Sequence, residues 1–318
     1  MLPKTEDLSM TIKQADRFSG IHVAMPACYD AYGNVSPESV RRLTRHLLDA
    51  GIRGLYVGGG TGEGILQTEE ERERTLEAVL EENGGTATVT VHVGAATTGA
   101  AIRLARHAET CGADAVSSIP PFYYAYTEEA VKEYWLSVME SAALPFILYY
   151  IPSATGFRMT ENMLRDLLRH ERLLGIKMTT FDTYELQRFK AIGGEKFLVF
   201  NGPDQQYVAG RIMGADAGIG GTYGAMPELF LKLEREYRLG HAAEAQRWQF
   251  IVNDIITEIR SIGLFAAVKG ILRLRGVDCG EPRRPLPGLR QTDEPAVRRL
   301  YETIVRYAKD CEQEVTAL

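Results

Sequence analysis

Cysteine is scarce in this sequence, and the few cysteines present do not form a recognisable site. Cys28, Cys111, Cys279 and Cys311 are the only four among 318 residues, and no two of them have CxxC or zinc-ligand spacing. This usage gives no sign of a disulfide framework and is typical of reduced thiols in a cytoplasmic protein. We expect the four side chains to behave as small hydrophobic residues of the core.

Long apolar segments and an excess of positive charge are also missing. No run of 18 apolar residues occurs, and the N-terminal segment MLPKTEDLSM carries acids and no apolar centre. Neither a membrane span nor a signal peptide is therefore expected. The net charge is -6 with both signs mixed along the chain, so no basic face is available for a nucleic-acid backbone. We expect a cytoplasmic protein that binds neither membranes nor nucleic acid.

Paired histidines are absent as well. None of the six histidines has HxxxH or HxH spacing, which argues against a metal-dependent aldolase or hydrolase. His92 lies within an apolar run, and we expect it to be a hydrogen-bonded core residue. No metal is expected in the active site.

Eight short apolar runs, rich in β-branched and aromatic residues, do recur along the chain, with amphipathic stretches between them. Such runs are typical of strands buried on both faces. Signals for helix starts lie between the runs, so the pattern predicts eight strand–helix units. The runs begin at residues 21, 52, 87, 113, 145, 173, 196 and 215, and the helix-start signals are Ser36 with Pro37, Thr68 with Glu71, Thr127, Thr160, and Asp182 with Glu185.

These units predict an α/β fold, a closed (β/α)8 TIM barrel over residues 1–225. An open doubly wound sheet is the alternative. The barrel is preferred because it leaves no edge strand, and because no dinucleotide-binding fingerprint follows the first strand. Residues 226–318 lose the strand signals but keep helical periodicity. They are expected to hold the last barrel helix and a C-terminal helical extension, not a separate catalytic domain.

In such a barrel the chemistry is expected where strands end and the following loops begin. The second strand ends in GGGTGEG, residues 58–64, which matches neither a Walker loop nor GxGxxG. Its glycines allow backbone N–H groups to point at an anion, and Thr61 adds a hydroxyl. A tight turn that needs positive φ is the structural alternative for this segment.

A lysine and a tyrosine end two neighbouring strands. Tyr149 and Tyr150 in YYIP lie on opposite strand faces, so only one can face the barrel axis, and Lys177 ends the next strand in LLGIKMT. A lysine buried on an inward face tends toward the neutral form, which attacks carbonyl groups. Alternatively Lys177 reaches solvent or pairs with a carboxylate. An anion-binding loop, a phenol and a buried amine together are the parts of a Schiff-base aldolase.

Several motifs resemble, in order, those of the pyruvate-dependent class I aldolases, the family of dihydrodipicolinate synthase and N-acetylneuraminate lyase. The similarity extends from about residue 18 to about residue 305, and Tyr149 and Lys177 are 28 positions apart, as the family expects. It implies that Lys177 forms an imine with pyruvate or a 2-keto acid without a cofactor, and that Tyr149 moves the proton at the aldol oxygen. The motifs are GGGTGE, IPPFYY, YYIPSATG, GIKMTT, NGPDQ and GADAGIGGTYG.

The resemblance also implies how the substrate carboxylate is held. Thr61 and the backbone of Gly59 and Gly60 would bind it, and Thr61 would link Tyr149 to Tyr123. In such enzymes this last tyrosine can come from a neighbouring subunit, and the family typically forms homotetramers or homodimers. The implied partners are pyruvate and an aldehyde, or the 2-keto acid that yields them.

The residues that follow distinguish the branches of the family. Synthases carry an arginine for the second substrate where this chain has Ala154, so the chain is closer to the lyase branch. Sialic-acid lyases generally have serine at the positions of Gly60 and Gly221, and an acid at that of Gln205. Each polar group that is missing here removes a hydrogen bond to the carboxylate or to the sugar hydroxyls. Pro203 also replaces a tyrosine. The resemblance also places six residues around the aldehyde portion of the substrate. They are Thr179, Gly202, Asp204, Gln205, Gly221 and Phe265.

Other functions stay open at this point. One alternative is a 4-hydroxy-tetrahydrodipicolinate (dihydrodipicolinate) synthase, and another is an aldolase or dehydratase of 2-keto-3-deoxy sugar acids. A barrel that binds a carbonyl ligand without catalysis is the non-enzymatic alternative, because fold alone does not prove activity. The presence of Tyr149, Thr61 and Lys177 together favours the enzyme.

Overall fold

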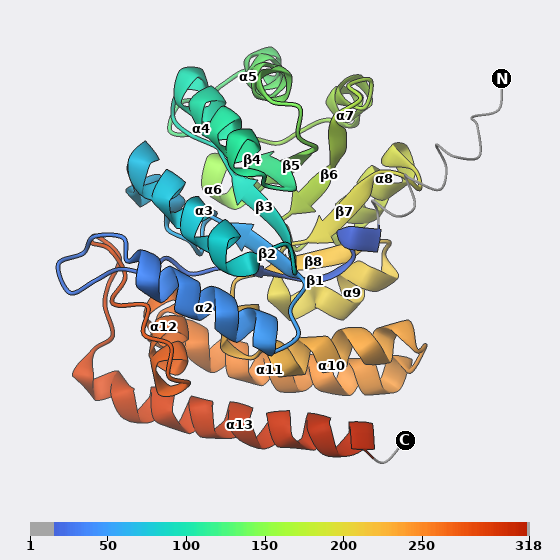
Figure 1. Ribbon diagram of the computed structural model, residues 1–318. Helices are drawn as coiled ribbons and strands as arrows, with labels where there is room; N and C mark the ends of the chain where they lie inside the picture. Colours follow the sequence, from blue (N-terminus) through green and yellow to red (C-terminus); the bar gives the residue numbers. More distant parts are fainter. Residues whose placement is uncertain (1–15, 317–318) are drawn as a thin grey trace.

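The chain forms a closed barrel of eight parallel strands, each hydrogen-bonded to its neighbours in sequence order (Figure 1). The structure is a computed structural model that describes the backbone of residues 16–316 and the side chains of residues 16–311. The barrel closes because β1 pairs with both β2 and β8. The strands are β1 (Gly20–Ala24), β2 (Gly54–Val57), β3 (Thr88–His92), β4 (Ala115–Ser118), β5 (Phe146–Tyr150), β6 (Leu173–Met178), β7 (Leu198–Asn201) and β8 (Ala217–Gly220).

The predicted (β/α)8 barrel is confirmed, and the open-sheet alternative is wrong, because closure leaves no edge strand. Each strand is shorter than the apolar run that predicted it. Part of each run continues into the loop that follows the strand, as residues 58 and 59 do after β2. Apolar composition therefore located the strands and, beyond their ends, the loops that carry the site.

Helices surround the barrel and begin at the predicted positions. Side chains of Ser36, Thr68, Thr127, Thr160 and Asp182 accept the hydrogen bond of an N-cap, and Thr68 forms a complete capping box with Glu71. The helices are α2 (Pro37–Asp49), α3 (Glu69–Asn83), α4 (Thr98–Cys111), α5 (Glu128–Ser141), α6 (Pro152–Thr155), α7 (Glu161–Leu167), α8 (Thr183–Gly193), α9 (Tyr207–Ile212) and α10 (Pro227–Arg238), with short 3-10 turns η1 (Gly64–Leu66), η2 (Asp204–Gln206) and η3 (Tyr223–Ala225).

Helices also make up the C-terminal part of the chain, as expected. The turn η4 (Gln291–Asp293) precedes the last of the helices α11 (Ala242–Ile262), α12 (Leu264–Leu274) and α13 (Glu294–Thr316). Helix α13 packs against α10, α11 and α12 along one side of the barrel (Figure 1). Within residues 16–316, no helix combines the length and apolarity needed to cross a membrane.

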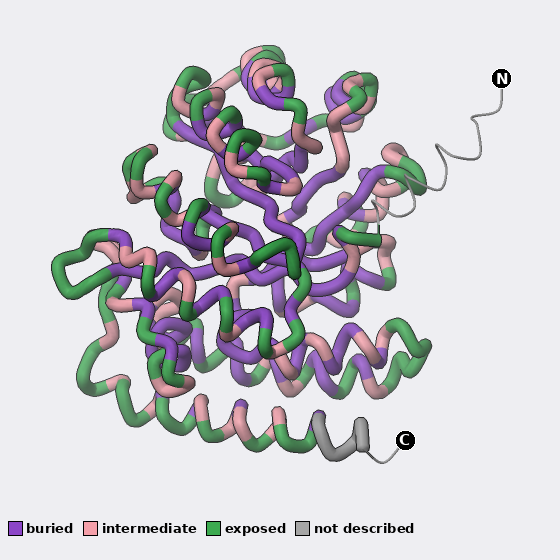
Figure 2. The backbone as a smooth tube through the Cα atoms, viewed as in Figure 1, coloured by how far each residue is buried: buried purple, intermediate pink, exposed green. Residues whose placement is uncertain are grey.

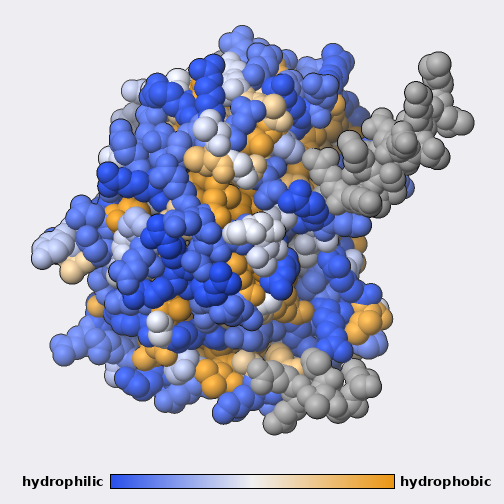
Figure 3. Space-filling model, viewed as in Figure 1, coloured by the Kyte–Doolittle hydropathy of each residue, from blue (hydrophilic) through white to orange (hydrophobic). Residues whose placement is uncertain are grey.

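The buried residues form an inner and an outer layer, and the strands between them are buried except for the first two residues of β6 (Figure 2). Successive strand residues point to opposite faces, so Tyr149 enters the inner cluster with Tyr56 and Phe200, whereas Tyr150 enters the outer core. On the face seen in Figure 3 hydrophilic residues predominate, and apolar residues form smaller patches between them.

The four cysteines are free thiols, but they do not all lie in the core. Cys28, Cys279 and Cys311 are buried, as expected. The prediction is wrong for Cys111, which is only half-buried because it lies in the last turn of α4, on the outer surface of the barrel, beside polar groups.

Candidate active site

The amine of Lys177 lies inside the barrel between two aromatic rings. Its Nζ is 4.3 Å from the centre of the Tyr56 ring and 4.1 Å from that of Tyr149, and the residue is only 4% exposed. Lys177 on β6 is the direct partner of Tyr149 on β5, so both side chains enter the barrel at one level. The strands thus place an amine and a phenol together on the barrel axis.

A phenol and an imidazole lie next to this pair. Tyr56 donates a hydrogen bond to Ser117 (3.0 Å), and burial raises the pKa of its phenol well above the ordinary value. His92 packs edge-on to Tyr149, with ring centres 5.8 Å apart, and burial lowers the pKa of its imidazole well below the ordinary value. The ring is held by the carbonyl of Gly58, which accepts from Nδ1 (3.2 Å), as expected for a hydrogen-bonded core histidine. A neutral phenol and a neutral imidazole therefore lie beside Lys177 and Tyr149.

The glycine loop after β2 reaches the Tyr149 hydroxyl. A side-chain carbon built on Gly60 would lie 3.9 Å from that oxygen, with no closer neighbour. Thr61 next to it approaches the loop after β8, since a carbon built on Gly221 would lie 2.7 Å from the Thr61 hydroxyl. A hydroxyl and loop backbone thus converge beside the phenol, in an arrangement suited to a carboxylate.

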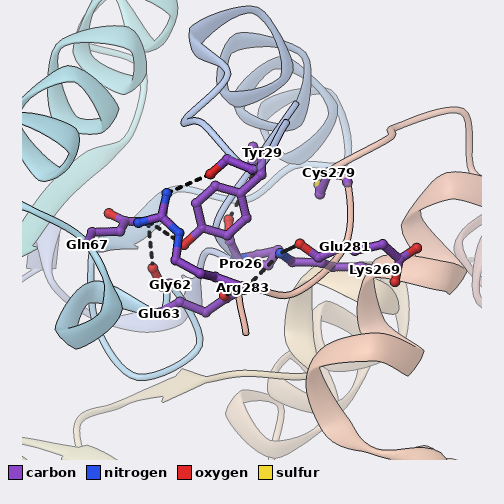
Figure 4. Close-up of polar contacts among 12 residues, drawn as sticks. Pro26, Tyr29, Gly62, Glu63, Gln67, Lys269, Cys279, Glu281 and Arg283 are labelled. Atoms are coloured by element: carbon purple, nitrogen blue, oxygen red, sulfur yellow. Dashed lines mark hydrogen bonds and ion pairs between the residues drawn. The ribbon is translucent and has the colours of Figure 1, made fainter. Parts of the chain in front are cut away.

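A buried ion pair anchors the far end of this loop to the C-terminal helices. Glu63 has a left-handed backbone (φ 52°) and its carboxylate lies 2.8 Å from Nζ of Lys269 on α12. The second carboxylate oxygen of Glu63 accepts from the backbone N–H of Arg283 (2.7 Å), and Lys269 also donates to the carbonyl of Glu281 (3.2 Å). Figure 4 shows these residues converging from the loop and the C-terminal segment. Both partners are almost inaccessible, so the helical extension directly supports the loop.

The carboxyl group of Asp204, which follows β7, lies against the loop after β8. Both the backbone N–H (2.8 Å) and the hydroxyl (2.6 Å) of Thr222 donate to Asp204. Burial raises the pKa of Asp204, while these hydrogen bonds and the charge of Lys177 act in the opposite direction. The Asp204 side chain is thus fixed in orientation by the loop after β8.

A cavity of about 620 Å³ opens over these residues. Gly59 does not line it, because its α-carbon faces the ring of Tyr56, where an added side-chain carbon would meet Cε1 at 2.5 Å. The predicted residues that do line it are Gly60, Thr61, Tyr149, Lys177, Thr179, Gly202, Asp204, Gln205, Gly221 and Phe265.

Tyr123 is the one predicted catalytic residue that the chain does not bring to this cavity. It lies on the loop between β4 and α5, is 89% exposed, and has a left-handed backbone (φ 81°). Tyr124 packs edge-on against it with ring centres 4.9 Å apart, and both line a second, smaller cavity. The Tyr123 side chain thus points away from the body of its own chain.

Two arginines and a threonine line the cavity without having been predicted. Arg158 follows α6, Arg260 lies on α11, and Thr222 follows β8. Thr222 could have been found, because it stands in a loop after a strand like the other site residues. The arginines lie outside the strand ends, so no local pattern distinguishes them.

A model of the Dihydrodipicolinate synthetase family matches residues 17–304 of the chain. The chain belongs to the dihydrodipicolinate synthetase family. The match covers the whole barrel and reaches α13, so the C-terminal helices belong to the family fold as well.

Curated relatives and solved structures place the chain within this family. The N-acetylneuraminate lyase of Mediterraneibacter gnavus is 38% identical over 93% of this chain and 95% of its own length. That of Rhizobium meliloti is 33% identical over 92% and 97%, respectively. The structure of the wild-type Ruminococcus gnavus sialic acid aldolase superposes with a TM-score of 0.90 at 37% identity, covering 94% of this chain and 99% of that one.

These similarities confirm the predicted class of enzyme. The chain is a class I aldolase, a carbon–carbon lyase of the pyruvate-dependent type, and it is closer to N-acetylneuraminate lyases than to the synthases.

Proposed function

We propose that the enzyme splits a 2-keto acid reversibly into pyruvate and an aldehyde through an imine on Lys177. The observation that carries this proposal is the position of the amine, which is 4% exposed and 4.1 Å from the Tyr149 ring at the base of a large cavity. Removing water from around an amine favours its neutral, nucleophilic form.

The reaction follows from these groups. The neutral amine of Lys177 adds to the C2 carbonyl of the substrate, and loss of one water gives the imine. Tyr149, as a phenolate, takes the proton of the C4 hydroxyl, the C3–C4 bond breaks, and its electron pair moves toward the protonated imine nitrogen while the aldehyde leaves. Tyr149 then returns this proton to C3, and addition of one water releases pyruvate and restores the amine. The nitrogen itself accepts the electrons, so no cofactor is required.

The substrate carboxylate would be held beside this pair by the Thr61 hydroxyl and the backbone of Gly60, whereas Gly59 lies outside the cavity. The convergence of Gly60 and Thr61 on the Tyr149 hydroxyl and Gly221 supports this assignment. Tyr123 would complete the proton path in the site of a neighbouring subunit, because it projects away from its own cavity. We therefore propose a homotetramer or homodimer that acts in the cytoplasm, and light scattering after gel filtration tests its size.

For the aldehyde portion we propose an N-acylated or polyhydroxylated sugar like that of sialic acid. The relatives named N-acetylneuraminate lyase support this choice, and Asp204, Thr179, Gln205 and Phe265 line the corresponding part of the cavity. Asp204 is held in place by two hydrogen bonds from Thr222 and is the carboxyl group that lines this part of the cavity.

A 2-keto-3-deoxy sugar acid with a further anionic group is the second candidate. Arg158 and Arg260 line the cavity, and within the described residues neither forms an ion pair. Two guanidinium groups that line the cavity and form no ion pair among the described residues favour a negatively charged group at the far end of the substrate.

Borohydride reduction in the presence of pyruvate tests the proposed chemistry. Wild-type enzyme should gain the mass of one reduced pyruvate on Lys177, whereas Lys177→Met should gain none and the exposed-lysine control Lys196→Met should be labelled like wild type. Label on another lysine, or none, would refute the imine. Pyruvate release from N-acetylneuraminate and from 2-keto-3-deoxy sugar acids, with and without phosphate, then distinguishes the two substrate classes.

A further inference from the structure

Three side chains with metal-ligating atoms meet on the outer surface of the barrel, on two neighbouring helices. Glu77 lies on α3, and His107 and Cys111 lie one turn apart on α4. The HxxxC spacing puts the imidazole and the thiol on the same face of α4. Helices α3 and α4 pack side by side (Figure 1), so Glu77 faces that pair across the helix interface.

The distances are close to those of a zinc site. His107 Nε2 lies 3.0 Å from Glu77 Oε1 and 3.4 Å from Cys111 Sγ, and a ligand atom from each residue lies within 4.8 Å of the others. Tetrahedral zinc with bonds of about 2.0 Å to nitrogen and oxygen and about 2.3 Å to sulfur needs ligand atoms about 3.3–3.6 Å apart. Small rotations of these side chains would therefore create the required geometry.

Negatively charged side chains lie around the thiol. The carboxylates of Glu77 and Glu73 both act electrostatically on Cys111. Glu73 lies one helical turn before Glu77 on α3, so a second carboxylate faces the same site. A divalent cation would reverse the effect of this negative field and stabilise the thiolate.

We propose that Glu77, His107 and Cys111 bind one Zn²⁺ ion per chain, with Glu73 or a water molecule as the fourth ligand. One nitrogen, one thiolate and carboxylate oxygen suit zinc rather than magnesium or calcium, which prefer oxygen alone. Binding replaces the thiol proton by the metal, and the ion would link α3 to α4. Cys111 precedes β4, whereas Lys177 is near the C-terminal end of β6, so the site lies toward the end of the barrel opposite the catalytic cavity.

Cobalt substitution tests this proposal directly. Untagged protein, reduced and freed of metal, is titrated with Co²⁺ and followed by its absorption spectrum. One equivalent should produce the near-ultraviolet charge-transfer band of a thiolate ligand together with strong visible bands of a tetrahedral site, and Zn²⁺ should abolish both. The absence of a saturable charge-transfer band in wild type would overturn the proposal.

Variants identify the ligands. Cys111→Ser should lose the charge-transfer band, and Glu77→Gln should keep the band but weaken Co²⁺ binding about tenfold or more. His170→Gln, which changes a histidine outside the cluster, should bind Co²⁺ like wild type. A band that persists in Cys111→Ser, or equal affinity in Glu77→Gln, would place the metal elsewhere and refute the assignment. Far-ultraviolet circular dichroism confirms that each variant is folded, and pyruvate release should be unchanged in Cys111→Ser.

Discussion

The Nζ of Lys177 lies 4.1 Å from the centre of the Tyr149 ring, and the two residues are direct partners in the pairing of β6 with β5. Their separation is therefore set by the hydrogen-bonded barrel and not by a loop. Catalytic groups held on rigid strands keep their geometry within the narrow tolerance that proton transfer requires. The glycine loop, in contrast, is anchored by the ion pair between Glu63 and Lys269.

Removal of the Tyr149 hydroxyl should separate imine formation from carbon–carbon cleavage. In Tyr149→Phe we expect pyruvate still to be trapped on Lys177 at the end point, while kcat for aldol cleavage falls about 10²- to 10⁴-fold, the usual contribution of a general base. Tyr150→Phe is the matched control, because this neighbouring hydroxyl donates outward to Glu185 (2.9 Å). Equal losses in the two variants would contradict the role of Tyr149.

Two glycines of the site should respond differently to serine. Gly60→Ser should fold normally, because the nearest atom to the added carbon is the Tyr149 hydroxyl at 3.9 Å, and its hydroxyl should improve kcat/KM for a sialic acid about fivefold by one hydrogen bond. Gly221→Ser should displace Thr61, whose hydroxyl lies only 2.7 Å from the added carbon.

The second variant should therefore raise the KM for pyruvate in the synthetic direction about tenfold or more, the effect of a lost hydrogen bond to a charged group. Steady-state kinetics of both variants in both directions measures these effects. If Gly60→Ser raised the KM for pyruvate more than Gly221→Ser does, the placement of the carboxylate beside Thr61 would be wrong.

Loss of the buried cation at position 269 should destabilise the fold strongly. Lys269→Met leaves Glu63 charged and without its partner in a site where the two side chains are 2% and 0% exposed, which should lower the free energy of unfolding by about 3–5 kcal/mol. Arg290→Met removes the partner of Asp293 in a surface pair, in which the Arg290 side chain is 71% exposed. This variant should change the free energy of unfolding by about 1 kcal/mol or less. Urea denaturation compares the two.

The Glu63→Gln/Lys269→Met double variant should recover part of the stability, because no buried charge remains. A double variant less stable than Lys269→Met would show that the ion pair is not the source of the loss.

Stability should fall in mild acid because of a buried histidine. Burial lowers the pKa of His22, which is 1% exposed, from 6.5 to about 4. Between these values the unfolded chain binds the proton and the folded chain does not, so the free energy of unfolding should decrease as pH falls, by about 3 kcal/mol in total. His92 shifts in the same direction.

Urea denaturation at several pH values between 7.5 and 4 measures this dependence. His22→Gln keeps a donor for the Phe18 carbonyl, which the Nε2–H of His22 contacts at 3.0 Å, and should flatten the dependence. An equally steep loss of stability in that variant would assign the effect to other groups.

Local patterns in the sequence determined the strands, the helix starts and the class of chemistry. An N-cap such as Thr68 contacts groups only a few residues away, and burial of β5 and β6 on both faces requires apolar runs, so both features are visible without any tertiary information. The order of the motifs around Tyr149 and Lys177 then identified the aldolase family correctly.

Only the tertiary structure decided which distant residues meet. Nothing near Glu63 in the sequence indicates its pairing with Lys269, Arg260 enters the cavity from a helix beyond the barrel, and Glu77 meets Cys111 across two helices. Such contacts depend on how the strands close and how the helices pack, which brings together segments that share no periodicity or spacing. The sequence by itself therefore specified the elements and the family, and packing of those elements determined which side chains surround the cavity.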